Sequence, residues 1–312
     1  MTLCRLRDVH MEYSREQVLR GVDLTIERGT ILGLVGENGS GKSTMLKILA
    51  GVLRPTQGTL ESAETRPRIG YMPESSQWYP YLTGAQVLAY FARYTGASAA
   101  AQDEILERVG LAPMRDKKVE AYSKGMRQKL GLAQAILGSP DLIVLDEPTN
   151  GLDPPGIIDF YQVLQERADQ GVSVVLSSHL LAEIEGRTTH VAFLRDGRIA
   201  ASGPCHDLIK TAGLRSRVRL QGARRVDLLY GLLEGSGWDV RATDGGIEVV
   251  VDRDEVSVLL ASLDPSLVGS IDVQVEHPTL DELYLHTLAP ERTTMAPGKN
   301  GRAKAGHVKV RR

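Results

Sequence analysis

The sequence predicts an α/β fold with a mixed sheet and a helical subdomain, followed by a small α+β domain. Three observations lead to this prediction. A glycine-rich segment, Gly36 to Thr44, lies between a short apolar run and a segment with helical periodicity. Further apolar runs alternate with helical segments, which is typical of parallel or mixed sheets. Near Gly213 the pattern changes to shorter elements in another order, which indicates a second domain.

The glycine-rich segment reads G-E-N-G-S-G-K-S-T and matches the phosphate-binding pattern G-x-x-x-x-G-K-[ST]. The apolar run before it is typical of a buried strand, and the helix after it turns the positive end of its dipole toward an anion. Glycines let backbone N–H groups surround a phosphate, the lysine brings a positive charge, and the serine hydroxyl can reach Mg²⁺. The alternative is a glycine-rich turn without a ligand. We expect nucleotide contacts from Gly36, Asn38, Gly39, Gly41, Lys42, Ser43 and Thr44.

The elements of the first domain follow in order along the chain. Residues 3–28 alternate in hydrophobicity and predict an antiparallel hairpin. Residues 52–82 are rich in Gly, Pro, Thr and Ser around one short strand, and from about Gly84 to Ser139 apolar residues recur with helical spacing. We therefore expect a helical subdomain at about 84–139 within a domain of residues 1–212. The strands and helix expected outside the subdomain are Ile31–Val35, Ile69–Met72, Leu142–Leu145, Ile157–Ala168 (helix), Val172–Leu176 and Val191–Leu194.

The second domain is expected at residues 213–290. Residues 216–276 can be divided into the order β-α-β-β-α-β, which is the ferredoxin-like arrangement. A final helix at Thr279–Leu288 begins with a capping box, Thr279-x-x-Glu282, behind a proline. Residues 291–312 hold seven Lys or Arg and one acid among small and polar residues, which is typical of a disordered basic tail. Such a tail contacts anionic lipid or is simply solvated, and we favour the solvated tail.

Composition excludes several classes of protein. The formal net charge of −2 among 312 residues gives no reason to expect a nucleic-acid partner. The two cysteines, Cys4 and Cys205, are far apart and lack a C-x-x-C partner, which argues against a disulfide framework and favours a reducing compartment. No segment approaches the ~20 apolar residues that cross a bilayer, and the N-terminus has no apolar signal region. We expect a cytoplasmic chain that does not span a membrane by itself.

An apolar strand at Leu142–Leu145 ends in two adjacent carboxylates, Asp146 and Glu147. Adjacent residues on a strand point in opposite directions. Asp146 can therefore hold Mg²⁺ while Glu147 polarises a water in line with the terminal phosphate. The alternative is an ordinary strand-end turn before Pro148, which has little weight beside the phosphate loop. Together the two motifs predict a nucleoside triphosphatase.

A second anion-binding segment lies between these motifs. In Tyr122-Ser-Lys-Gly-Met126, Ser123 is placed to cap the following helix, and a helix N-terminus favours an anion. One chain rarely needs two helix ends for one triphosphate. The order of the phosphate loop, the Ser123-x-Gly125 signature, the Asp-Glu strand, Asn150-Gly-Leu-Asp153 and Ser-Ser-His179 resembles that of ATP-binding-cassette (ABC) ATPases.

The resemblance covers about residues 1–212 and implies ATP and Mg²⁺ as ligands, with ATP hydrolysis coupled to transport. It implies a homodimer in which two copies face head to tail, so that Ser123, Lys124 and Gly125 of one copy complete the nucleotide site of the other. It also assigns adenine stacking to Tyr13, a γ-phosphate contact to His179, and coupling at the dimer seam to Asp153. The alternatives are one more strand aromatic for Tyr13 and a satisfied surface histidine for His179.

Two departures from the family pattern bear on the chemistry. The usual leucine, second-position glycine and glutamine of the signature are Tyr122, Lys124 and Met126 here, and the usual glutamine after the Ile69–Met72 strand is Glu74. A carboxylate at Glu74 adds negative charge near Mg²⁺ and the γ-phosphate. The expected Mg²⁺ site therefore comprises Ser43, Glu74 and Asp146, with a turnover that can differ from that of glutamine-bearing relatives.

Within the family, Tyr71–Gly84 and Tyr122–Gly138 most resemble ATPase subunits that serve copper-site maturation of nitrous-oxide reductase. This implies an integral membrane permease as partner, an indirect link to a periplasmic subunit, and a position at the cytoplasmic face of the inner membrane. The candidate permease contacts are Tyr79, Pro80, Tyr81 and Leu82. The alternatives are an exporter ATPase for a drug, lipid or polysaccharide, and a soluble ABC protein that does not act in transport.

The chain itself is not expected to bind copper. Its seven histidines are scattered, its seven methionines form no M-x-M cluster, and Cys205-His206 offers two donors at most. The predicted role is to supply energy to partners that handle the cargo.

Overall fold

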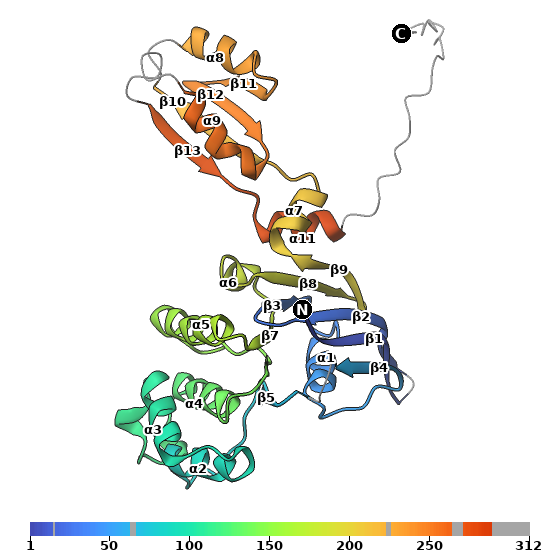
Figure 1. Cartoon of the computed structure of the whole chain (residues 1–312), viewed down its shortest axis with the longest axis vertical. Helices are drawn as coiled ribbons and strands as arrows, with labels where there is room; N and C mark the ends of the chain where they lie inside the picture. Colours follow the sequence, from blue (N-terminus) through green and yellow to red (C-terminus); the bar gives the residue numbers. More distant parts are fainter. Residues whose placement is uncertain (15, 63–66, 223–225, 264–270, 289–312) are drawn as a thin grey trace, which may run out of the picture.

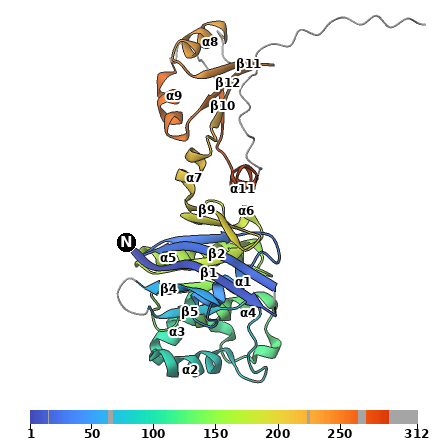
Figure 2. The same ribbon diagram turned by 90° about the vertical axis from the view of Figure 1, so that its right-hand side faces the viewer.

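The computed structural model describes residues 1–14, 16–62, 67–222, 226–263 and 271–288. Two sheets and most of the helices lie at one end of its long axis, and a smaller sheet with two helices lies at the other (Figures 1 and 2). Between them lie α7 (Cys205–Thr211) and α11 (Leu280–Leu288). The basic tail predicted at 291–312 lies outside the described residues.

A six-stranded sheet of order β5-β6-β7-β3-β8-β9 holds the candidate site. Its strands are β5 (Ile69–Met72), β6 (Leu142–Leu145), β7 (Ser173–Ser178), β3 (Ile31–Val35), β8 (His190–Arg195) and β9 (Arg198–Pro204). All neighbouring pairs are parallel except β8 and β9, so the predicted mixed sheet is confirmed. β3, β6 and β7 are buried along their whole length, as their continuous apolar runs predicted. Their carboxyl ends meet at one edge of the sheet, where ligands bind in α/β folds.

A three-stranded antiparallel sheet of order β2-β1-β4 covers α1 (Lys42–Leu49). β1 (Thr2–Tyr13) and β2 (Glu16–Glu27) form the predicted hairpin. The sequence did not reveal β4 (Gln57–Ser62), whose only large apolar residue is Leu60 and whose side chains are otherwise exposed. β4 pairs with β1 alone, and an exposed edge strand carries little hydrophobic periodicity.

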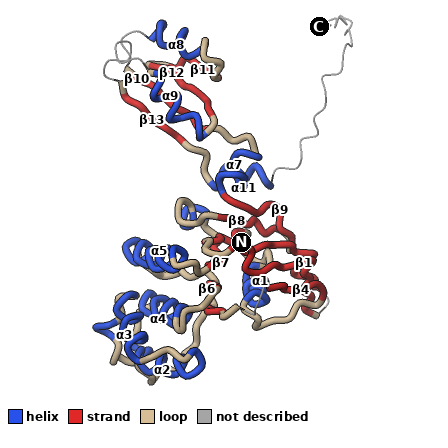
Figure 3. Tube along the Cα trace, viewed as in Figure 1, coloured by secondary structure: helices blue, strands red, loops and turns tan. Residues whose placement is uncertain are grey.

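The predicted helical subdomain contains α2 (Gly84–Thr95), α3 (Ala99–Arg108) and α4 (Lys124–Ile136), on the side away from β1, β2 and β4 (Figure 3). Tyr122 is buried just before α4, and its hydroxyl donates to the Met114 carbonyl at 2.7 Å. A Cβ at Gly84 would lie 2.3 Å from that hydroxyl. Tyr122 therefore fills the subdomain core and leaves Ser123 as the first exposed residue of the signature. α5 (Pro154–Asp169) packs on the six-stranded sheet. It begins three residues before the helix predicted at Ile157–Ala168.

The smaller sheet has the order β11-β12-β10-β13, and all its pairs are antiparallel. Its elements follow the chain as β10 (Ser216–Gln221), α8 (Val226–Glu234), β11 (Asp239–Thr243), β12 (Gly246–Val251), α9 (Val256–Ser262) and β13 (Asp272–Glu276). Leu229, Leu233 and Leu259 pack the two helices onto one face of this sheet.

The last described helix, α11, returns to the larger sheet. Leu280 and Leu283 are buried with residues of β8 and α6 (Leu181–Ile184), and the Tyr284 ring meets the Phe193 ring edge-on at 5.3 Å. The N-terminus of α11 is capped as predicted, because Glu282 N donates to the Thr279 hydroxyl at 3.2 Å. α11 thus packs on the first domain, although it follows the second in the sequence.

Replacing Gly70 with alanine is expected to destabilise the larger domain. A Cβ at Gly70 would lie 1.7 Å from the Ala135 carbonyl oxygen of α4, so the helix and strand would have to separate. We expect a loss of about 2 kcal/mol or more in the free energy of unfolding, measured by denaturant unfolding followed through Trp78, which packs against this core. Gly231→Ala is the control, because nothing lies near its Cβ in α8, and alanine is favoured there by ~0.5–1 kcal/mol. A denaturant midpoint of Gly70→Ala equal to that of the wild type would contradict the close approach of β5 to α4 at Gly70.

Candidate nucleotide site

A cavity of about 550 Å³ opens at the carboxyl edge of β3, β6 and β7. The residues that line it come from the phosphate loop and α1, from the segments after β5, β6 and β7, and from β2. These are Val18, Asn38, Gly39, Gly41, Lys42, Ser43, Thr44, Glu74, Glu147, Asn150 and His179. The structure therefore brings most of the predicted site residues to one place.

Two glycines of the phosphate loop, Gly41 and Gly36, are needed for different reasons. Gly41 has φ +106°, a conformation that side chains rarely adopt, and a Cβ there would lie 2.8 Å from Leu19 Cδ2. A Cβ at Gly36 would lie 2.3 Å from the Leu194 carbonyl oxygen at the end of β8. Gly36 was expected to contact the nucleotide but does not line the cavity. Its lack of a side chain lets the loop pass close to β8. The loop leads directly into α1, whose first residues Lys42, Ser43 and Thr44 line the cavity, and the first N–H groups of a helix lack partners within the helix and favour an anion.

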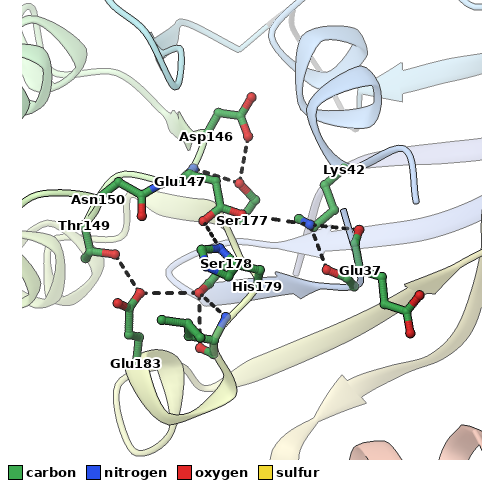
Figure 4. Close-up of polar contacts among 12 residues, drawn as sticks. Glu37, Lys42, Asp146, Glu147, Thr149, Asn150, Ser177, Ser178, His179 and Glu183 are labelled. Carbon is green, nitrogen blue, oxygen red and sulfur yellow. Dashed lines mark hydrogen bonds and ion pairs between the residues drawn. The ribbon is translucent and has the colours of Figure 1, made fainter. Parts of the chain in front are cut away.

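Lys42 is buried at the start of α1 and points back across the loop (Figure 4). Its Nζ donates to the Gly36 carbonyl at 2.7 Å and to the Glu37 carbonyl at 3.2 Å, and lies 3.9 Å from Glu147 Oε1. Burial lowers the pKa of Lys42 below its usual value, and the negative charges of Glu147, Asp146 and Glu74 offset this only in part. The ammonium is thus held where a terminal phosphate can exchange for the loop carbonyls.

Asp146 and Glu147 follow β6 and their side chains diverge (Figure 4). Both lie beyond the last residue of the strand, Leu145, so the divergence comes from the turn at Glu147 and not from the strand alternation that the sequence suggested. Both are buried, but Glu147 lines the cavity and Asp146 is not among the lining residues. Glu147 has φ +47°, which is uncommon for a residue with a side chain. Its backbone N–H donates to the Ser177 hydroxyl at 2.8 Å, and the same hydroxyl donates to Asp146 Oδ1 at 2.8 Å.

His179 lies just beyond the end of β7, and its Nδ1 is 2.8 Å from Glu147 Oε2. Because an ionised carboxylate only accepts hydrogen bonds, Nδ1 carries the hydrogen in this pair. The side chain is 39% exposed. Its other ring nitrogen is thus available to a ligand in the cavity.

The donor set fits Mg²⁺ bound together with phosphates. Ser43 and Glu74 line the cavity, whereas Asp146 is not a lining residue and accepts a hydrogen bond from Ser177; all three expected ligands supply oxygen. Across the described ranges, no three His, Cys, Asp or Glu side chains form a ready metal cluster. The negative charges of Glu147, Asp146 and Glu74 act on the Lys42 ammonium, so an added cation would favour a polyphosphate anion there.

The signature residues lie outside this cavity. Ser123 caps α4, with its hydroxyl accepting from Met126 N at 3.1 Å, as predicted. Lys124 covers Gly151, where an added Cβ would lie 2.4 Å from Lys124 Cδ. Asp153 caps α5 by accepting from Gly156 N at 3.1 Å. Ser123, Lys124 and Gly125 thus pack beside the 150–153 segment and do not line the cavity of their own chain.

Tyr13 ends β1 with 42% exposure and is not a lining residue. Val18 and Asn150 line the cavity and were not anticipated. Asn150 could have been found, because it lies only three residues after Glu147 in the sequence. Val18 could not, because it belongs to β2 and the position of that strand beside the phosphate loop cannot be read from the sequence.

Comparisons with known proteins point to one family. A family model described as ABC transporter matches residues 19–150. YdbJ of Bacillus subtilis (strain 168), an uncharacterized ABC transporter ATP-binding protein, is 36% identical over 259 residues, which cover 80% of this chain and 83% of YdbJ. The daunorubicin resistance ATP-binding protein DrrA3 of Streptomyces coeruleorubidus is 33% identical over 296 residues, which cover 90% of this chain and 94% of DrrA3. A solved ATP binding subunit of an ABC transporter has a TM-score of 0.64 at 30% identity and covers 68% of this chain and 94% of its own.

Proposed function

The chain belongs to the ABC transporter family, and from that membership and the cavity at Lys42 we propose that it is the ATP-hydrolysing subunit of a transporter. ATP hydrolysis coupled to transport is the general function of this family's ATPase domains. One observation carries the proposal. Lys42, Glu147 and His179 all line the cavity at the phosphate loop. The Glu147 carboxylate lies between the other two, with Oε1 3.9 Å from Lys42 Nζ and Oε2 2.8 Å from His179 Nδ1.

The residues divide the chemistry among them. The backbone of Asn38 to Gly41 and the Lys42 ammonium hold the phosphates, with Ser43 and Thr44 at the start of α1. Glu147 accepts the proton of the attacking water, and His179 holds Glu147 and contacts the γ-phosphate. Mg²⁺, when bound through Ser43, Asp146 and Glu74, neutralises charge on the phosphates. Tyr13 stacks on adenine from the end of β1, outside the phosphate cavity.

The nucleotide site is completed by a second copy of the chain. Ser123, Lys124 and Gly125 form a capped helix start of the kind that binds anions, yet they do not line the cavity of their own chain. A head-to-tail homodimer places the signature of each copy over the phosphate loop of the other. Two bound nucleotides would thus close the dimer, and hydrolysis would release it.

The partner is an integral membrane permease. No helix in the described part of the chain is long and apolar enough to cross a bilayer. Tyr79 and Tyr81 are 65% and 60% exposed with ring centroids 5.7 Å apart, and Tyr90 and Tyr94 are exposed on the adjoining helix α2. We propose that this aromatic surface receives the permease at the cytoplasmic face of the inner membrane.

The cargo has two candidates. The segments Tyr71–Gly84 and Tyr122–Gly138 favour a NosF-like role, in which the permease is NosY-like, the periplasmic subunit is NosD-like, and the transporter serves copper-site maturation of nitrous-oxide reductase. The match to DrrA3, whose name refers to daunorubicin resistance, favours export of another cargo. Purification of the Glu147→Gln chain with its membrane partner, followed by identification of the partner by mass spectrometry, distinguishes them. A NosY-like permease supports the first candidate and a drug-exporter permease contradicts it.

The second domain, expected at residues 213–290, is proposed to be a ferredoxin-like accessory domain formed by β10 to β13, while α11 within that range packs on the first domain. Its strand order β13-β10-β12-β11, with α8 and α9 on one face, supports this class. It carries no residue of the proposed nucleotide site.

Replacing Ser123 with aspartate tests the shared site. Aspartate caps a helix as well as serine does, so α4 is retained, but its charge would face the γ-phosphate of the partner's nucleotide. We expect ATPase activity to fall at least about tenfold, because ~1.4 kcal/mol of repulsion already suffices, while nucleotide still binds the single chain. Ser98→Asp is the matched control, because Ser98 caps α3 in the same way, with Ala101 N donating to its hydroxyl at 3.2 Å. A Ser123→Asp chain with the wild-type rate would rule out the shared site.

A further inference from the structure

We propose that Ser177 is a positioning residue for hydrolysis, whose hydroxyl fixes the Mg²⁺-binding carboxylate and the general base relative to each other. The proposal rests on the function proposed above. Ser177 does not line the cavity, so it acts through Asp146 and Glu147.

The Ser177 hydroxyl makes two short hydrogen bonds to consecutive residues of the neighbouring strand end. It donates to Asp146 Oδ1 at 2.8 Å and accepts from Glu147 N at 2.8 Å (Figure 4). Ser177 is fully buried and Asp146 is 2% exposed, so water does not compete for these bonds. Within the described part of the chain, Ser177 is the only side chain that hydrogen-bonds the Asp146 carboxylate.

The second bond supports an uncommon backbone conformation. Glu147 has φ +47°, and this turn at the end of β6 sends its side chain into the cavity while Asp146 stays behind it. Such a conformation persists only where surrounding groups hold it. The Ser177 hydroxyl accepts the hydrogen bond of the Glu147 N–H itself. Because β7 pairs in parallel with β6, the register of the two strands fixes the position of this hydroxyl beside the end of β6.

The next two residues extend the same arrangement. The Ser178 hydroxyl donates to Glu183 and accepts from Leu180 N, and His179 contacts the Glu147 carboxylate. Ser177 and His179 thus hold Glu147 at its backbone and at its carboxylate. Loss of the Ser177 hydroxyl would free the Asp146 carboxylate to rotate and leave the N–H of Glu147 without a partner.

The same strand supplies a matched control. Ser173 is also fully buried in β7, and its hydroxyl also bridges two groups, donating to the Glu27 carbonyl at 2.9 Å and accepting from Gly29 N at 3.2 Å. Those partners lie at the opposite end of the strand from the cavity. Ser173→Ala therefore reports the cost of losing a buried bridging hydroxyl without an effect on the carboxylates.

The test compares nucleotide binding with and without metal. The dissociation constant of a non-hydrolysable ATP analogue is measured by calorimetry in Mg²⁺ and in EDTA for the wild type, Ser177→Ala, Ser177→Thr and Ser173→Ala. We expect Ser177→Ala to weaken binding about tenfold in Mg²⁺, as loss of partners behind metal ligands does, and to leave binding in EDTA unchanged. Ser177→Thr keeps the hydroxyl and should restore the Mg²⁺ effect, and Ser173→Ala should lower the melting temperature alone.

The outcomes separate this proposal from the proposed function. The positioning role is overturned, while the function stands, if the ratio of the dissociation constants in Mg²⁺ and in EDTA is the same for Ser177→Ala as for the wild type. It is also overturned if Ser173→Ala weakens binding in Mg²⁺ as much as Ser177→Ala does. A wild-type chain that binds no analogue in either condition overturns both.

Discussion

The Glu147→Gln chain is expected to hydrolyse ATP about 10²- to 10⁴-fold more slowly than the wild type, the usual contribution of a general base. Glu147 is the carboxylate that lines the cavity, between the Lys42 ammonium at 3.9 Å and the His179 ring at 2.8 Å. Glutamine has the same shape and still accepts a hydrogen bond from His179, but its amide does not take a proton from water. Binding should persist, so with Mg-ATP the chain should elute as a dimer in size-exclusion chromatography.

Glu183→Gln is the control for this prediction. Glu183 is a nearby carboxylate that accepts from the Thr149 hydroxyl at 2.7 Å and the Ser178 hydroxyl at 3.4 Å, and it does not line the cavity. We expect its ATPase rate to stay within about tenfold of the wild type, because a structural hydrogen bond is worth ~1 kcal/mol. Phosphate release is measured for both chains. A Glu147→Gln chain with the wild-type rate would disprove the assignment of the base.

The site residues that the sequence revealed are those whose role depends on local order. Lys42 belongs to a loop whose glycine spacing is itself the signal, and Glu147 follows an apolar strand directly. Ser177 is different, because its role arises only when β7 lies beside β6 and places one hydroxyl between two residues about thirty positions earlier. A serine in an apolar strand carries no such signal by itself.

The same distinction applies to the fold. The hairpin, the buried strands and the helical subdomain could be predicted, since hydrophobic periodicity records burial. β4 was missed because its side chains are mostly exposed, and the return of α11 to β8 could not be read because it depends on contacts such as Tyr284 with Phe193. The departure at Tyr122 has a structural explanation, since Gly84 leaves room for its hydroxyl.

Replacing Lys42 with methionine is expected to weaken ATP binding at least about 30-fold, since loss of one partner of a buried charged pair costs ~2 kcal/mol or more. Methionine is unbranched and of similar volume, and it is only one atom shorter than lysine, so the change mainly removes the charge. The bonds of Nζ to the Gly36 and Glu37 carbonyls would be lost, and Glu147 would face the phosphates without the adjacent ammonium. The cavity would then hold an excess of negative charge at the point where the γ-phosphate must bind.

The dissociation constant is measured by calorimetry in Mg²⁺, with Lys47→Met as the control on the same helix. Lys47 lies in the last turn of α1 and does not line the cavity, so its loss should leave ATP affinity unchanged. Unfolding curves for both chains check that α1 is intact. An ATP affinity of Lys42→Met equal to that of the wild type would mean that the loop backbone alone holds the phosphates, and that the Lys42 ammonium serves only to close the loop onto Gly36.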